Sequence, residues 1–69
     1  MDDLTGLRAD YDAGTFTAAE LAREASEPES TVHRTLTDPD ANPRYSLVRS
    51  LVHAADRIKA RAASQEATA

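Results

Sequence analysis

A helix start signal at Thr17 constrains the fold of this chain more than any other feature. Thr17 stands three residues before Glu20, which is the spacing of a capping box. Phe16 before the cap and Leu21 after it have the spacing of a hydrophobic staple. Small and apolar residues follow at positions 18, 21, 22 and 25, so the pattern predicts a short amphipathic helix over residues 18–25.

A second helix is predicted before this one. Leu4, Leu7 and Tyr11 recur at helical spacing over residues 3–12. Gly14 follows, and glycine is common just after the last residue of a helix.

A third helix is predicted over about residues 28–37. Proline is tolerated in the first turn of a helix, so Pro28 indicates a new start, with Ser26 or Glu27 as the cap. Val32 and Leu36, four residues apart, are expected to face the core.

A longer helix is predicted after the polar loop that follows residue 37. Asn42 and Pro43 form a cap and first-turn pair, from which we expect this helix to begin. Its apolar stripe consists of Leu47, Val48, Leu51, Val52, Ala55 and Ile58. Residues 62–69 contain no large apolar side chain and are expected to form a frayed or disordered tail.

These segments predict a compact all-α domain over residues 1–61, with four helices and a fifth left open. The chain has no cysteine, which excludes a disulfide framework and a thiolate zinc site. Two histidines alone do not make a metal site, so we expect no metal and no cofactor. No apolar run approaches the roughly 18 residues that a membrane span needs. We therefore expect a cytoplasmic protein without a membrane partner.

The two short helices are separated by a few residues, as in a helix-turn-helix motif at about residues 17–37. Ala22 supplies the small side chain where the first helix faces the second, and Val32 supplies the branched anchor. With these residues, the segment from Phe16 to Leu36 resembles the Cro/cI-like (lambda-repressor-like, XRE-type) helix-turn-helix family. The resemblance continues through Asn42-Pro43-Arg44-Tyr45-Ser46-Leu47 and covers roughly residues 16–58. The chain departs from the family pattern in the turn, where Ser26 replaces the usual glycine, Glu27 an apolar residue and Pro28 a small capping residue.

The resemblance implies a sequence-specific DNA-binding regulator, such as a phage-type repressor, a Cro-like protein or an autoregulating antitoxin. The helix at about 28–37 would then enter the major groove of an inverted-repeat operator. Arg34 would pair with guanine and Glu29 with cytosine. Phosphate contacts would come from Arg44, Arg49 and the backbone near Thr17. The expected DNA-binding residues are Thr17, Glu29, Ser30, Thr31, His33, Arg34, Thr37, Arg44 and Arg49.

A homodimer is expected, because two-fold symmetric proteins match inverted repeats. The C-terminal part of the apolar stripe, at Val52, Ala55 and Ile58, is the expected interface.

The charge distribution keeps a second function open. The formal net charge is −4; residues 1–32 carry two basic and eight acidic residues, and residues 33–69 carry six basic and four acidic ones. The alternative is a protein-interaction module or inhibitor on the same scaffold, such as an anti-CRISPR-like or DNA-mimicking factor with a protein partner. An enzyme is not expected, because the chain has no phosphate-binding glycine loop and no set of nucleophile, base and orienting residue.

Overall fold

Four helices and their connecting loops make up the part of the chain described by the computed structural model, residues 3–68, with side chains for residues 3–64. The helices are α1 (Asp3–Asp12), α2 (Ala18–Ala25), α3 (Glu29–Thr37) and α4 (Tyr45–Thr68). Over these residues no strand forms, so the all-α prediction with four helices is confirmed. None of the helices between residues 3 and 68 combines the length and apolarity that crossing a bilayer requires.

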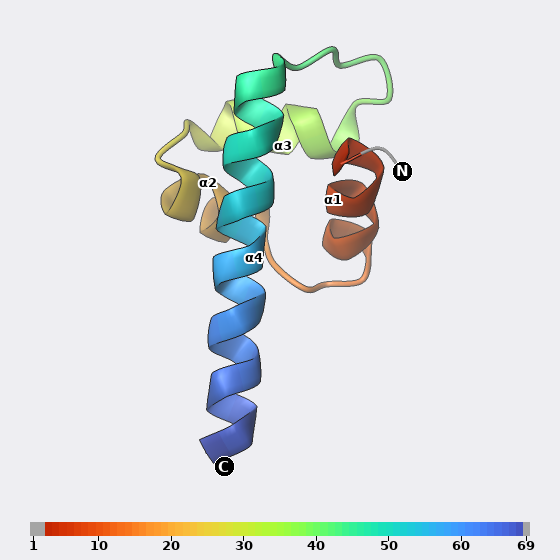
Figure 1. The fold of residues 1–69 in the computed structure, drawn as a ribbon. Coiled ribbons are helices and arrows are strands. Elements are labelled where there is room, and N and C mark those ends of the chain that lie inside the picture. The colour runs from red at the N-terminus through yellow and green to blue at the C-terminus, as the bar shows by residue number, and fades with distance from the viewer. Residues whose placement is uncertain (1–2, 69) are drawn as a thin grey trace.

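The long helix α4 packs against two of the three short helices. It packs against α2 and α1, and α3 in turn packs against α2 and α1. Leu21 of α2, Val32 of α3 and Leu51 of α4 are the largest fully buried side chains. In Figure 1 the three short helices surround the first half of α4, while its C-terminal part extends beyond them.

The capping box at the start of α2 is confirmed. The Thr17 backbone N–H donates to Glu20 Oε1 over 3.0 Å, and the Glu20 backbone N–H donates to Thr17 Oγ1 over 3.1 Å. Phe16 and Leu21, the expected staple, are both buried in the core. These local contacts explain why α2 has the bounds predicted from the sequence.

The turn between α2 and α3 depends on a left-handed residue. Ser26 adopts φ 57° and ψ 43°, and the next N–H, that of Glu27, donates to Ala22 O over 2.9 Å. Pro28 is the N-cap residue of α3, so the helix begins at Glu29. The structure thus places Pro28 before the first turn, and not inside it as predicted from the sequence. The Pro28 carbonyl accepts from the Val32 N–H over 3.1 Å, as expected of a cap residue.

Ser26→Gly is expected to raise the free energy of unfolding by about 0.5–1 kcal/mol, because glycine adopts the left-handed region without the clash of a Cβ atom. Thermal unfolding followed by circular dichroism measures the change. Ala60→Gly, in the exposed part of α4, is the control and should be destabilising by about 1 kcal/mol. A loss of stability in Ser26→Gly would contradict the left-handed turn.

Both ends of α4 differ from the sequence prediction. The helix begins at Tyr45 and not at Asn42 and Pro43: the first helical hydrogen bond is accepted by the residue just before it, Arg44, from the Val48 N–H over 3.1 Å. The loop before Asn42 forms a separate turn, in which the Asp40 N–H donates to Asp38 Oδ1 over 2.9 Å. At the other end α4 continues to Thr68, where a frayed tail is expected, and only Ala69 of that tail lies outside the described residues. Residues 62–68 contain neither glycine nor proline, so nothing in the local sequence ends the helix.

Ion pairs join α4 to α2 and α1. Glu24 of α2 accepts from Arg57 Nε over 2.9 Å and from Arg61 Nη2 over 2.6 Å. Lys59 Nζ lies 3.0 Å from Asp10 Oδ2 of α1. The hydrogen bonds from Arg57 and Arg61 hold the pKa of Glu24 below its usual value.

Glu24→Gln is expected to lower stability near neutral pH and to make it less sensitive to acid. The pKa of Glu24 is lower in the folded protein than in the unfolded chain. Its contribution to stability is therefore fully present above its unfolded-state pKa and is lost as the pH falls through its folded-state pKa. Urea unfolding of the wild type and the variant between pH 7 and pH 3 measures the difference, which should shrink toward acid. Asp12→Asn is the control, since Asp12 is exposed and forms no ion pair within residues 3–64. A difference that stays constant with pH would contradict the Glu24 contacts.

Candidate nucleic-acid interface

Helix α3 has one buried and one exposed face. Val32, Thr35 and Leu36 face the core. The six residues predicted to contact DNA from this helix are all exposed; we call them the α3 outer face, namely Glu29, Ser30, Thr31, His33, Arg34 and Thr37. The inward positions of Val32 and Leu36 are as predicted, whereas the burial of Thr35 was not predicted. The Thr35 hydroxyl donates to Thr31 O over 2.8 Å, which satisfies a polar group that is only 3% exposed.

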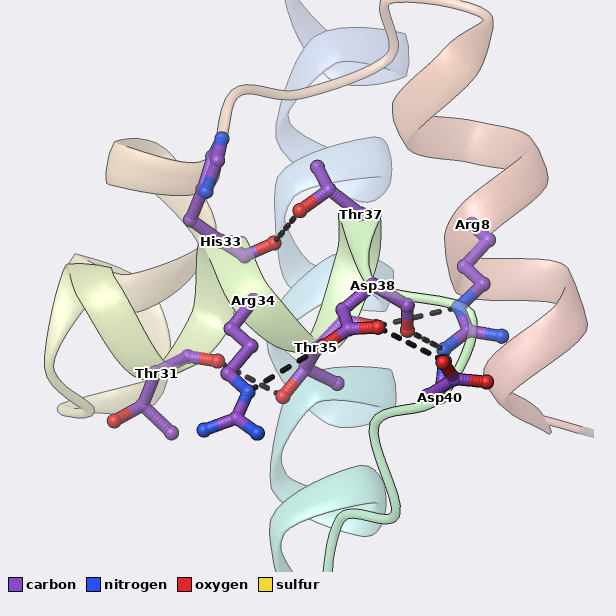
Figure 2. A network of polar contacts seen from close by, with 8 residues as sticks. All are labelled: Arg8, Thr31, His33, Arg34, Thr35, Thr37, Asp38 and Asp40. Atoms are coloured by element: carbon purple, nitrogen blue, oxygen red, sulfur yellow. Dashed lines mark hydrogen bonds and ion pairs between the residues drawn. The ribbon is translucent and has the colours of Figure 1, made fainter.

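Four side chains of the outer face lie along two edges of α3. In Figure 2, Thr31 and Arg34 lie along one edge, and His33 and Thr37 lie along the other. The Thr37 hydroxyl donates to its own helix, to His33 O over 2.8 Å. The outer face therefore presents hydroxyl, imidazole, carboxylate and guanidinium groups, which can make hydrogen bonds to base edges and phosphates.

Among the cations that form ion pairs within residues 3–64, Arg34 has the most exposed side chain. Its Nε lies 3.6 Å from Asp38 Oδ2, and its side chain is still 76% exposed. A surface pair at this distance contributes little to stability, and it leaves most of the guanidinium open to a ligand.

Arg44 lies beside the same edge of α3. Two surface grooves meet there, and Thr31, Arg44 and Leu47 line both of them. Arg34 lines the second groove with Asn42 and Pro43. Arg44 forms no ion pair within residues 3–64, and α4, which begins directly after it, has no acidic residue in its first turn. The positive end of the α4 dipole and a free guanidinium thus stand at the edge of the outer face.

Two of the residues predicted to contact phosphate, Arg49 and Thr17, already have partners within the protein. Arg49 lines neither groove; it lies 4.0 Å from Asp3 Oδ2 and 3.3 Å from His53 Nε2. Thr17 is exposed at the start of α2, but the Glu20 carboxylate already accepts from its N–H. A phosphate there would approach a like charge, which makes this the least favourable of the predicted contacts.

The three residues of the expected dimer interface do not form one exposed patch. Ala55 is 2% exposed and belongs to the core. Val52 lines a groove between α4 and α1, and Ile58 lines another beside α2. Both are partly buried against the core, so their free surface lies on two sides of α4.

Sequence reasoning missed two residues near this surface. Tyr45 is 74% exposed, the only large hydrophobic side chain so exposed in the described residues, and it directly follows Arg44. Arg8 of α1 donates to two carbonyls at the C-terminal end of α3. No local pattern indicates the partners of Arg8, because they depend on how distant helices pack.

Comparison with protein-family models, with curated proteins and with solved structures finds no match to this chain.

Proposed function

We propose that this protein is a small sequence-specific DNA-binding regulator, in which α2 and α3 form a helix-turn-helix motif of the lambda-repressor-like type. The observation that carries the proposal is the division of α3. Its three buried residues anchor it, and the six residues expected to contact DNA are all exposed. An α-helix is about 10–12 Å in diameter with its side chains, which fits a major groove about 12 Å wide.

The chemistry of the outer face supports readout of bases at one edge and of the backbone beside it. Arg34 is exposed enough to pair bidentately with guanine O6 and N7, and Glu29 can accept from cytosine N4. Arg44, without an ion pair in residues 3–64, is suited to a phosphate next to the same edge.

An inverted-repeat operator and a homodimer belong to the same proposal, because one α3 covers a single half-site. Val52 and Ile58 are the two expected interface residues with surface left for a second chain.

A second function is favoured because most of the basic residues already have partners within this protein. Of the eight, six already bind carboxylates or carbonyl groups of this chain: Arg8, Arg34, Arg49, Arg57, Lys59 and Arg61. The net charge is −4, and Glu29 stands on the outer face itself. Under this alternative the α3 outer face binds a protein, as an inhibitor of a nuclease or of a DNA-binding protein would.

The two functions are separated by fluorescence anisotropy with labelled duplexes at two salt concentrations. One duplex carries the DNA upstream of the protein's own gene, and the control is a random duplex of equal length. A regulator should prefer the upstream DNA, with an affinity that falls as salt rises. Equal weak binding to both duplexes, or none, would overturn the proposal and favour a protein partner.

A further inference from the structure

Arg8, which lies on α1, forms hydrogen bonds to the C-terminal end of α3. Its Nε donates to Thr35 O over 3.2 Å, and its Nη2 donates to Asp38 O over 2.9 Å. The last carbonyls of a helix have no partner within the helix, and a cation there also interacts favourably with the helix dipole. Figure 2 shows the guanidinium of Arg8 reaching from α1 to this end of α3.

The same contact continues to the outer face through Asp38. Asp38 receives the Arg8 hydrogen bond on its carbonyl, and its Oδ2 pairs with Arg34 Nε at 3.6 Å. Its Oδ1 accepts from the Asp40 N–H, so both carboxylate oxygens are held. A continuous series of contacts thus runs from α1 through Asp38 to the guanidinium expected to read a base.

The opposite end of α3 has no comparable support. Its cap, Pro28, makes no side-chain hydrogen bond to the helix, and the turn before it contains the left-handed Ser26. This end is held by the burial of Val32 and by backbone hydrogen bonds of the turn, whereas the C-terminal end is held in addition by the side chain of Arg8.

We propose that Arg8 is a positioning residue for the α3 outer face: it sets the orientation of α3 against α1 and, through Asp38, the direction of Arg34. Its effect on base selection rests on the proposed function, whereas its effect on the geometry of α3 does not. Lysine cannot replace it, because an ammonium group lacks the fork that reaches two carbonyls at fixed geometry.

The test compares Arg8→Lys and Arg8→Met with Arg23→Lys and Arg23→Met. Arg23 is an exposed arginine of α2 that forms no ion pair within residues 3–64, which makes it a matched control. Two readouts are needed: ¹H–¹⁵N spectra of the free protein, and the ratio of affinities for the upstream and random duplexes at a temperature where every variant is folded. If Arg8→Met does not fold, Arg8→Lys still decides, since it keeps the charge and most of the stem.

We expect the Arg8 Nε–H to exchange slowly in the wild type. In both Arg8 variants the backbone amides from Thr35 to Asp40 and the Arg34 Nε–H should shift. The affinity ratio should fall by about 5-fold or more, the range of one misplaced arginine–guanine contact, while binding to the random duplex changes less than about 2-fold. A purely structural role would lower the melting temperature and leave the ratio unchanged.

The outcomes separate this inference from the proposed function. Spectra around α3 that stay as in the wild type, or an unchanged ratio in a wild type that discriminates, would overturn the positioning role. A wild type that does not discriminate between the duplexes overturns DNA reading alone, and the spectra of the Arg8 variants then decide whether Arg8 positions α3.

Discussion

Leu51→Ala is expected to lower the free energy of unfolding by about 2–5 kcal/mol, because it removes three buried carbons and leaves a cavity. Leu51 is fully buried in the first half of α4, within the core formed with the other helices. A domain of 69 residues has a total stability of only about 3–10 kcal/mol, so the variant should be partly unfolded at room temperature.

Urea unfolding followed at 222 nm measures the change, with Leu47→Ala as the matched control. Leu47 lies one turn earlier on α4 and is only partly buried against the core. Its truncation should therefore cost clearly less. If the two variants lose equal stability, or if Leu51→Ala loses less than about 1 kcal/mol, α4 does not form the centre of the core as described.

The parts of the fold that could be predicted are those with local signals. α1 and α2 have the predicted bounds, because Gly14 at φ 81° ends the first and the capping box at Thr17 begins the second. Both signals act within four residues of chain, so the sequence contains all the information they need.

The errors in the fold arise where two local signals compete. Asn42 and Pro43 are a good helix start in isolation, but they directly follow the turn held by Asp38, and α4 begins only at Tyr45. Pro28 suits both the cap and the first turn, and the sequence does not distinguish between them.

The candidate site was predictable in its pattern but not in its contacts. Helical periodicity from Val32 and Leu36 is enough to place six residues on the outer face. The support of that face by Arg8 joins residues 27 and 30 positions apart, and the Lys59–Asp10 pair joins residues 49 apart. Such contacts depend on how helices are arranged in space, which local patterns in a single sequence do not reveal.

Replacement of Arg34, Arg44 and Arg49 together by alanine is expected to weaken binding to the upstream duplex by at least about 100-fold. Arg34 alone should account for about 1–3 kcal/mol as a bidentate guanine contact. Removing Arg44 should also remove a phosphate contact, which reduces the slope of log affinity against log salt concentration by about one. Arg49, which contacts Asp3 and His53, should contribute least of the three.

Single substitutions show which of these effects is specific. Arg44→Ala and Arg23→Ala each remove one exposed arginine without an ion pair in residues 3–64, and only Arg44 lies beside the α3 outer face. Arg44→Ala should therefore weaken binding to both duplexes, and Arg23→Ala should have little effect. Arg34→Lys keeps the charge but loses the planar fork, so it should lose preference for the upstream duplex and keep most of its affinity for the random one.

The triple variant also separates the proposed regulator from the alternative protein-interaction module. Its melting temperature should stay close to that of the wild type, because Arg34 and Arg49 form only exposed surface pairs and Arg44 forms none in residues 3–64. A folded variant without DNA affinity is what a regulator predicts. A folded variant that binds the upstream duplex as the wild type does would mean that these arginines do not contact DNA. The carboxylates of the outer face, Glu29 first, would then be the residues to test against a basic protein partner.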